Sequence, residues 1–344
     1  MRILIVKMSS LGDIIHTLPA VSDVVRCYPE ARIDWVVEDA FREVVTWHNA
    51  VHQVIPVAFR RWKRAPLTSL LGDEWKQFRQ RLRRDEYDVV IDAQGLMKSA
   101  FVTKMARAKK RVGFDRDSVR EKPAAMFYDR TVAAQEYIIP RMRHLFASAL
   151  DYPLPDESPD FGIGHQYFRP NYLPEGNFVV FLHGTTWPNK HWPEGFWRQL
   201  VELTTAAGFR VCLPWGNADE RSRARRLASG IAAAEVLPRL QLAEMAAVIQ
   251  ASLAVVGLDS GLSYLAAALA VPSLVLYGPT QPPLPGDHDE VQFYRVAKFP
   301  CAPCFQRECT YTRLKTVDPP CFGNSPPREV WHQLQEIIEA HADY

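Results

Sequence analysis

The residues of this chain best suited to chemistry come directly after predicted buried strands. Residues 2–7 (RILIVK) form a continuous apolar run typical of a strand buried on both faces, and Asp13 lies in the turn that follows. A carboxylate at a strand end is a candidate general base, but at the start of a helix it is also a common N-cap. Spacing alone favours the cap for Asp13. Lys7 ends the same run, where its ammonium could stabilise a departing anionic group.

A second set of polar residues, in the latter half of the chain, has the chemistry of a diphosphate site. The segment 183–186 (HGTT) follows one predicted strand, and 257–262 (GLDSGL) follows another and opens a helix. Hydroxyls, turn amides and an ammonium bind phosphates, and a nearby glutamate can accept hydrogen bonds from a ribose. Each segment alone suits an ordinary polar loop, but together they predict a nucleotide-diphosphate pocket formed by Thr185, Thr186, Lys190, Glu220, Asp259, Ser260, Gly261 and Leu262. A dinucleotide-binding dehydrogenase is disfavoured because G-x-G-x-x-G is absent.

Four of the six cysteines form a cluster with the spacing C-x2-C-x4-C-x11-C, at Cys301, Cys304, Cys309 and Cys321. Disulfides are not expected in a cytoplasmic protein, so a metal site is the sharper interpretation. Four thiolates suit tetrahedral ligation of a structural zinc or iron ion. The alternative is four free thiols in a proline-rich loop.

These candidate residues require elements that bring strand ends together. Apolar runs predict strands at 2–7, 32–37, 51–57, 87–92, 178–183, 210–215, 254–258 and 273–277, with helices between them that include 14–27, 96–108 and 327–341. Such alternation predicts an α/β protein with two doubly wound, Rossmann-like domains facing each other across a crevice. We expect a first domain at 1–155, a linker at 151–176 and a second domain at 177–326, with the C-terminal helix 327–344 packing back on the first.

Charge is unevenly distributed along the 344 residues, whose formal net charge is +2. Residues 1–150 hold 26 Lys and Arg against 18 Asp and Glu, a balance of +8, whereas the remainder holds 15 against 21, a balance of −6. The basic half contains cation clusters at 60–64, 81–84 and 109–111. They match no nucleic-acid-binding motif, so no nucleic-acid partner is expected. Either they solvate helices or they face an anionic partner.

Neither a membrane span nor a signal peptide is predicted. No apolar run approaches the roughly 18 residues that a transmembrane helix needs, and the first apolar run stops at Lys7. We therefore expect a cytoplasmic protein.

Several segments together carry a resemblance that runs in order from residue 1 to about 284. The chain resembles the ADP-heptose-using glycosyltransferases of family 9 in MRILIVKMSSLGDIIHTLPAVSD (1–23), WVVE (35–38), RRWKR (60–64), DAQGLMKSA (92–100), KHWP (190–193), LPWG (213–216), GLDSGLS (257–263) and YGPT (277–280). Tyr264 stands where familiar members have histidine. The cysteine cluster is similar to a segment of family members that bind iron.

The resemblance implies the GT-B fold and inverting transfer of L-glycero-D-manno-heptose from ADP-heptose to the first Kdo of Kdo2-lipid A, with no metal needed for catalysis. Asp13 becomes the implied general base, the eight residues of the diphosphate pocket become the implied donor site, and the implied acceptor-facing cations are Arg60, Arg61, Lys63, Arg64, Lys98 and Arg120. The protein would work peripherally on the cytoplasmic face of the inner membrane. The alternatives are another acceptor, either a core sugar or a protein hydroxyl, and a non-catalytic nucleotide-sugar binding protein. The oligomeric state is left open.

Overall fold

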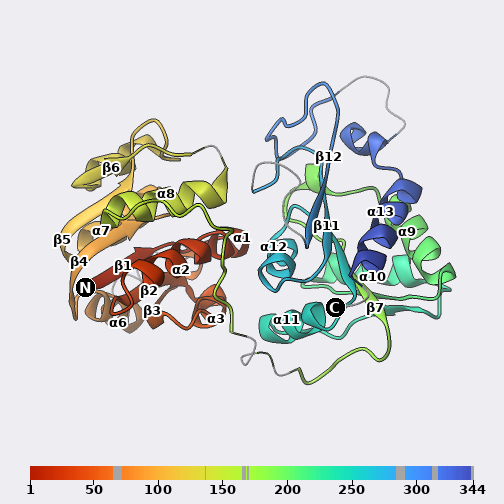
Figure 1. Cartoon of the computed structure of the whole chain (residues 1–344), viewed down its shortest axis with the longest axis horizontal. Helices are drawn as coiled ribbons and strands as arrows, with labels where there is room; N and C mark the ends of the chain where they lie inside the picture. Colours follow the sequence, from red (N-terminus) through yellow and green to blue (C-terminus); the bar gives the residue numbers. More distant parts are fainter. Residues whose placement is uncertain are drawn as a thin grey trace. The chain divides into compact units, whose positions relative to one another are not determined.

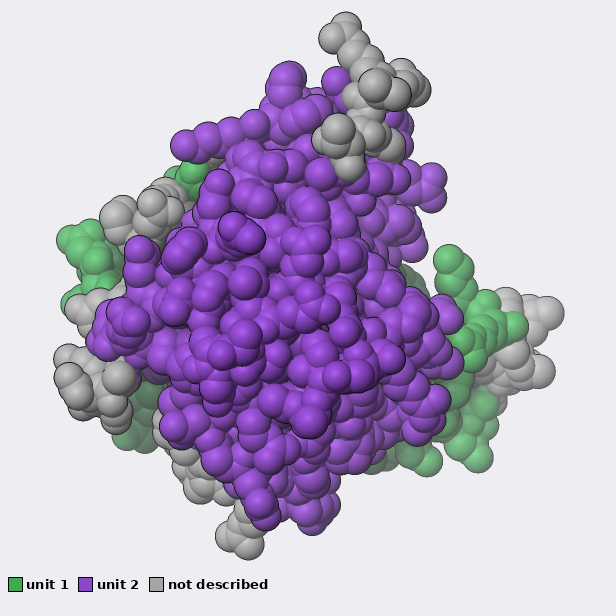
Figure 2. All heavy atoms as spheres, turned by 90° about the vertical axis from the view of Figure 1, so that its right-hand side faces the viewer, with its two compact units in different colours: residues 1–165 green, residues 166–344 purple. Residues whose placement is uncertain are grey.

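The computed structural model describes residues 1–64, 72–135, 137–164, 168, 170–283, 291–311 and 317–341. The chain divides into two units, residues 1–165 and 166–344, which are coloured separately in Figure 2. The boundary falls inside the linker expected at 151–176. Each unit is an α/β domain built around one parallel sheet.

Unit 1 contains six parallel strands in the order β3-β2-β1-β4-β5-β6 (Figure 1). The strands are β1 (Arg2–Val6), β2 (Arg32–Glu38), β3 (Val51–Val57), β4 (Glu86–Asp92), β5 (Arg107–Phe114) and β6 (Arg130–Val132). The helices are α1 (Leu11–Ile15), α2 (Leu18–Cys27), α3 (Arg42–Thr46), α4 (Phe59–Trp62), α6 (Asp73–Leu82), α7 (Met97–Met105) and α8 (Ile138–Leu150).

The central strand β1 is buried on both faces, as its continuous apolar sequence predicts. Leu4 and Val6 pack into a core cluster that also holds Phe78 of α6 and Val102 of α7. Because side chains alternate along a strand, Ile3 and Ile5 point to the opposite face. Helices α2 and α8 pack against each other and lie side by side in Figure 1.

Unit 2 repeats the architecture with the strand order β12-β11-β10-β7-β8-β9. The strands are β7 (Phe178–Leu182), β8 (Arg210–Leu213), β9 (Ala234–Val236), β10 (Ala254–Leu258), β11 (Ser273–Tyr277) and β12 (Gln292–Val296). The main helices are α9 (Glu194–Ala206), α10 (Ala218–Ala228), α11 (Leu242–Gln250), α12 (Gly261–Ala268) and α13 (Pro327–Ala340). Read from the first strand of each unit, both sheets follow the Rossmann order 3-2-1-4-5-6.

The C-terminal helix α13 packs in unit 2, and the expectation that it packs back on the first domain is wrong. Its apolar face, which includes Val330, Leu334 and Ile337, is buried in the core of unit 2 together with Trp197 of α9. The sequence shows that the helix has an apolar face but not which core receives it. Here that face covers α9 and strands β10 and β11.

The Rossmann order fixes where ligands bind. In such a sheet the second and third strands are added on one side of the first strand, and the fourth to sixth strands on its other side. The strand order therefore reverses between the first and fourth strands, and ligands occupy the carboxyl ends of the strands at that switch point. In unit 1 this point lies after β1 and β4, and in unit 2 after β7 and β10. Asp13 follows β1, and Asp259 follows β10.

Candidate active site

Asp13 belongs to the first turn of α1, beside a buried ammonium group. Its Oδ2 accepts hydrogen bonds from the backbone N–H of Ser10 (2.8 Å) and from the Ser10 hydroxyl (2.7 Å). Its Oδ1 lies 3.7 Å from Nζ of Lys7. Asp13 is therefore the third helical residue of a capping box and not the N-cap itself, which is Ser10. With 38% of its side chain exposed, the carboxylate remains open to a ligand.

Burial and pairing set the charge of these two groups. Burial disfavours the charged form of Asp13, but the ammonium of Lys7 and the hydrogen bonds from Ser10 outweigh it and lower the pKa of the carboxyl. Burial also lowers the pKa of Lys7, against the opposing effects of Asp13 and Asp92. Lys7 donates to the carbonyl of Ala93 at 2.9 Å, which fixes its ammonium at the end of the strand.

The loop after β4 holds the Asp13 loop in place, a role that the sequence analysis missed. Oε1 of Gln94 accepts hydrogen bonds from the backbone N–H groups of Met8 (2.9 Å) and Ser9 (3.0 Å). The fully buried Asp92 in turn accepts from the N–H of Gln94 and from the Tyr128 hydroxyl, both within 2.9 Å. The sequence did contain a signal for this role: Gln94 is a polar residue in the turn 92–95, directly after the strand next to β1 at the switch point.

The cations expected to face the acceptor also lie at carboxyl ends of unit 1 strands. Arg60 and Arg61 belong to α4, which follows β3, and Lys63 and Arg64 come directly after it. The backbone N–H of Arg60 donates to the Glu38 carboxylate (3.0 Å), and the N–H of Glu38 donates to the Met8 carbonyl (3.0 Å). These bonds join the loops after three strands. Arg61 forms an exposed ion pair with Glu74 of α6 (2.9 Å), which was not expected.

Lys98 and Arg120 occupy adjoining loops of the same unit. Lys98 lies in the first turn of α7, directly after β4. Arg120 is exposed, and its backbone N would lie 3.7 Å from a Cβ placed on Gly95. The carboxylate of Glu121 accepts the N–H of Met97 at 2.6 Å, which closes the loop after β5 against α7.

In unit 2, Asp259 is the centre of the polar cluster after β10. Its Oδ2 lies 2.5 Å from Nζ of Lys190 and accepts the Thr280 hydroxyl at 2.6 Å. The backbone carbonyl of Asp259 accepts the hydroxyl of Thr185 at 3.4 Å. The structure thus brings the loops after β7, β10 and β11 together around one carboxylate. Thr280 was not predicted as a site residue, although it comes directly after a predicted strand.

The other predicted donor residues lie at the same end of the sheet. Ser260 is the N-cap of α12, which Gly261 and Leu262 begin, and Thr186 is exposed in the loop after β7. Glu220 of α10 accepts the N–H of Gly216 at 2.7 Å. A Cβ on Gly184 would approach the Glu220 carboxyl to 3.0 Å, so the loop after β7 lies directly against this carboxylate.

Tyr264, at the position where the resemblance implies a histidine, holds the Asp259 carboxylate. Its hydroxyl donates a short hydrogen bond to Oδ1 of Asp259 and accepts one from Tyr277. Burial and the neighbouring Tyr277 and Asp259 raise the pKa of Tyr264 far above its usual value, so the phenol stays protonated and donates. Asp259 is therefore fixed by hydrogen bonds as well as by the ammonium of Lys190.

The four clustered cysteines line one small cavity of about 50 Å³, together with Asn189 and Pro279. Their thiols do not form a metal site in this geometry: among the described residues, no group of three or more Cys, His, Asp or Glu side chains is arranged to hold a metal ion. Burial, followed by the neighbouring thiols, raises the pKa of Cys321 to about 12, so its thiol is neutral. The expectation of zinc or iron thus finds no support in this arrangement.

Within the described parts of the chain, no helix is both long enough and apolar enough to cross a membrane.

Two parallel sheets in Rossmann order, each with a polar cluster at its switch point, place the protein among α/β proteins with the GT-B fold.

Comparison with known proteins narrows this class to one family. Residues 75–315 match the model of glycosyltransferase family 9 (heptosyltransferase). Lipopolysaccharide heptosyltransferase 1 of Pseudomonas aeruginosa is 48% identical over 99% of both chains, and its Escherichia coli counterpart is 45% identical over 85% of this chain and 92% of its own. The solved E. coli heptosyltransferase WaaC with ADP-2-deoxy-2-fluoro heptose superimposes with a TM-score of 0.77 at 43% identity, covering 86% of this chain and 93% of that one. The chain therefore belongs to glycosyltransferase family 9 and is an enzyme of that family.

Proposed function

We propose that this protein transfers L-glycero-D-manno-heptose, with inversion, from ADP-heptose to the first Kdo of Kdo2-lipid A during synthesis of the lipopolysaccharide inner core. Similarity to heptosyltransferase 1 along the whole chain supports the reaction, and the E. coli relative was solved with an ADP-heptose analogue. The observation that carries the proposal is the ionised, partly exposed Asp13 at the switch point of unit 1. A protein that only binds nucleotide sugars has no need of that carboxylate.

Asp13 acts as the general base in the proposed reaction. It takes the proton from the acceptor hydroxyl while that oxygen bonds to the anomeric carbon of heptose. The bond between this carbon and the diphosphate oxygen breaks in the same step, and ADP leaves with the electron pair. Lys7 keeps Asp13 ionised and fixed, since the two groups lie 3.7 Å apart.

The polar cluster of unit 2 binds the donor in this proposal. Lys190 and the hydroxyls of Thr185, Thr186 and Ser260 contact the diphosphate, and Glu220 accepts hydrogen bonds from the ribose. Positive charge at Lys190 stabilises the negative charge that develops on the departing ADP. Asp259, Gly261 and Leu262 shape the loop that receives these groups.

The exposed cations of unit 1 bind the acceptor, whose phosphates and carboxylates carry several negative charges. Exposed charges are screened over about 8 Å at physiological ionic strength, so acceptor binding should depend strongly on salt. We expect Arg120→Ala to raise the apparent KM for the acceptor by roughly three- to tenfold, about what one exposed charged contact contributes. Initial rates at several salt concentrations would measure this change.

Arg116→Ala is the matched control, because Arg116 is an exposed cation of the same loop that is not assigned to the acceptor. It should leave the acceptor KM within about twofold. An acceptor KM that is indifferent both to salt and to Arg120→Ala would contradict the acceptor assignment.

The acceptor itself is decided by a direct assay. The purified protein would be incubated with ADP-heptose and either Kdo2-lipid A or an already heptosylated core, and the products analysed by mass spectrometry. Modification of Kdo2-lipid A alone supports the proposal. Modification of the heptosylated core or of a protein hydroxyl would keep the donor and replace the acceptor.

We further propose that the enzyme works at the cytoplasmic face of the inner membrane, where a lipid-linked acceptor is within reach.

A structural zinc or iron ion at Cys301, Cys304, Cys309 and Cys321 is a separate proposal. It is supported by the four thiols that line a single cavity, which has room for one ion. The thiols would have to move toward a common centre, to metal–sulfur distances of about 2.3 Å, because the described side chains are not arranged to hold a metal ion as they stand. Such an ion would order a proline-rich segment that has few apolar residues of its own.

Elemental analysis of protein purified without chelator tests this proposal. We expect near-stoichiometric zinc or iron in the parent, and its loss together with a lower melting temperature in Cys301→Ser and Cys321→Ser. Cys27→Ser is the matched control, because Cys27 is a free cysteine outside the cluster. Parent protein without metal would overturn the proposal.

A further inference from the structure

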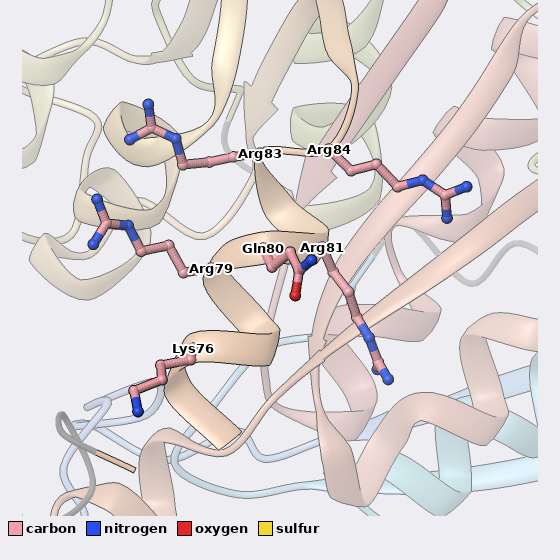
Figure 3. A pocket seen from close by; sticks show the side chains of 6 residues that line it. All are labelled: Lys76, Arg79, Gln80, Arg81, Arg83 and Arg84. Carbon is pink, nitrogen blue, oxygen red and sulfur yellow. The ribbon is translucent and has the colours of Figure 1, made fainter. Parts of the chain in front are cut away.

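The C-terminal end of α6 carries a dense group of cations that the proposed reaction does not use. An open hollow of about 710 Å³ at this place is lined by Lys76, Arg79, Gln80, Arg81, Arg83 and Arg84. Figure 3 shows these six side chains. In this view Arg79 and Arg83 extend to one side of the helix, and Arg81 and Arg84 to the other. The guanidinium groups spread over a wide area and do not converge on one point. This spacing suits a surface that carries many anionic groups better than a single bound ion.

These arginines are not neutralised within the fold. Arg79, Arg81, Arg83 and Arg84 are exposed, and within the described ranges none of their side chains forms an ion pair. Several exposed positive charges without ion-pair partners raise the local positive potential, which attracts an anionic partner.

Two of the four arginines on helix α10 of unit 2 share a carboxylate. There Arg226 forms a two-pronged ion pair with Glu194, with contacts of 2.6 and 2.8 Å, and Arg223 lies 3.9 Å from the same carboxylate. The charges of Arg223 and Arg226 are thus neutralised within unit 2, whereas none of the four arginines at the end of α6 forms an ion pair with a described residue.

An exposed aromatic residue lies beside the same helix. The ring of Phe101 on α7 is stacked on Trp75 of α6, with ring centroids 6.5 Å apart, and Phe101 remains 48% exposed. Aromatic side chains next to cations are typical of surfaces that rest on a bilayer, where the ring enters the headgroup region and the cations meet the phosphates.

Helix α6 is also fastened to the helix that carries the proposed acceptor cations. Glu74 of α6 accepts hydrogen bonds from Arg61 (2.9 Å) and from Nε1 of Trp62 (3.0 Å), and the Trp62 and Trp75 rings meet edge to face. A surface that holds α6 on a membrane would therefore also hold α4 near that membrane.

We propose that Arg79, Arg81, Arg83, Arg84 and Phe101, the α6 basic surface, dock the enzyme on the anionic phospholipid headgroups of a bilayer. This inference rests on the proposed function, because only a lipid-linked acceptor requires the enzyme at a membrane. The surface binds the bulk lipid and is distinct from the residues assigned to the acceptor.

Vesicle sedimentation with the full-length protein tests this surface. The wild type should bind vesicles of mixed phosphatidylglycerol and phosphatidylcholine, release them as salt rises, and bind pure phosphatidylcholine weakly. Each cation near an anionic bilayer strengthens binding about fivefold, so the triple variant R81Q/R83Q/R84Q should bind at least about tenfold more weakly. The control R225Q/R239Q/R328Q removes three exposed cations from unit 2 and should bind within about twofold of the wild type.

Turnover on a deacylated, water-soluble acceptor separates the two proposals. R81Q/R83Q/R84Q should keep the wild-type rate there and lose rate only on acceptor embedded in anionic vesicles. Equal vesicle binding by the two triple variants, or equal binding to neutral vesicles, would overturn the α6 basic surface. So would a loss of binding to duplex DNA with no loss on vesicles, because that would identify a nucleic-acid surface. If the wild type transfers no heptose to either acceptor, the proposed function fails, while the vesicle comparison still decides the surface.

Discussion

Replacing Asp13 with asparagine should lower kcat by about 10³-fold, within the range that a general base contributes. An amide cannot accept the proton of the acceptor hydroxyl at neutral pH. Its oxygen can still accept the N–H of Ser10, so the first turn of α1 should persist. The Kd for ADP, measured by calorimetry, should change by less than about twofold, because the donor cluster belongs to unit 2.

Loss of the carboxylate also leaves the buried Lys7 without its anionic neighbour, so a matched variant is needed. Ser10→Ala removes the hydroxyl that donates to Asp13 but keeps the carboxylate and its 3.7 Å contact with Lys7. Its kcat should fall by less than about tenfold. If Ser10→Ala and Asp13→Asn reduced turnover equally, or if the asparagine variant kept the wild-type rate, Asp13 would serve only the capping box. Melting temperatures of both variants would separate loss of folding from loss of the base.

The central strands of both sheets could be predicted from the sequence because burial on both faces leaves a continuous apolar run. Strands β1, β10 and β11 were predicted to within a residue or two for this reason. Strands β5, β6 and β9 carry no such signal. In β5 only the last three residues, Val112 to Phe114, are buried, and the preceding cations were assigned to a helix at 96–108 and to a charge cluster. Strands β6 and β9 have three residues each, too few for any period to show.

The predicted helix at 14–27 is two helices, α1 and α2, separated by His16 and Thr17. This break decides how Asp13 is held. The capping box depends on the backbone path from Ser10, and the 3.7 Å approach of Lys7 depends on where the strand ends relative to that turn. Spacing along the chain contains neither quantity, so the sequence supported both a cap and a base.

The candidate donor residues were predictable as a group, because polar residues after parallel strands meet at one edge of the sheet. Their pairing was not. Lys190 was assigned to a diphosphate, but in this structure its ammonium is bonded to Asp259, and that carboxylate is also held by Thr280 and Tyr264. The partners come from segments 69 to 90 residues distant from Lys190 in the sequence, where only the folded sheet brings them together.

Because Lys190 is ion-paired with Asp259, we expect Lys190→Ala to weaken the binding of ADP much more than that of AMP. We propose that Lys190 exchanges part of its contact with Asp259 for the diphosphate when ADP binds. A hydrogen bond between charged groups contributes about 1.5 to 3 kcal/mol, so the variant should bind ADP about 10- to 100-fold more weakly. AMP lacks the second phosphate, and its affinity should fall by less than about threefold. Isothermal titration of the two nucleotides gives both numbers from one preparation.

The fold should tolerate this change. Without the ammonium, Asp259 still accepts hydrogen bonds from Thr280 and Tyr264, and Lys190 ends a short 3-10 helix outside the core strands. Lys298→Ala is the control, because it removes an exposed cation of unit 2 that is not assigned to the donor, and it should leave both affinities unchanged. Equal weakening of ADP and AMP by Lys190→Ala would mean that Lys190 orders the loops around Asp259 and does not bind the diphosphate. Selective loss of ADP would place the leaving group of the reaction at the switch point of unit 2, beside the ammonium that stabilises its developing charge.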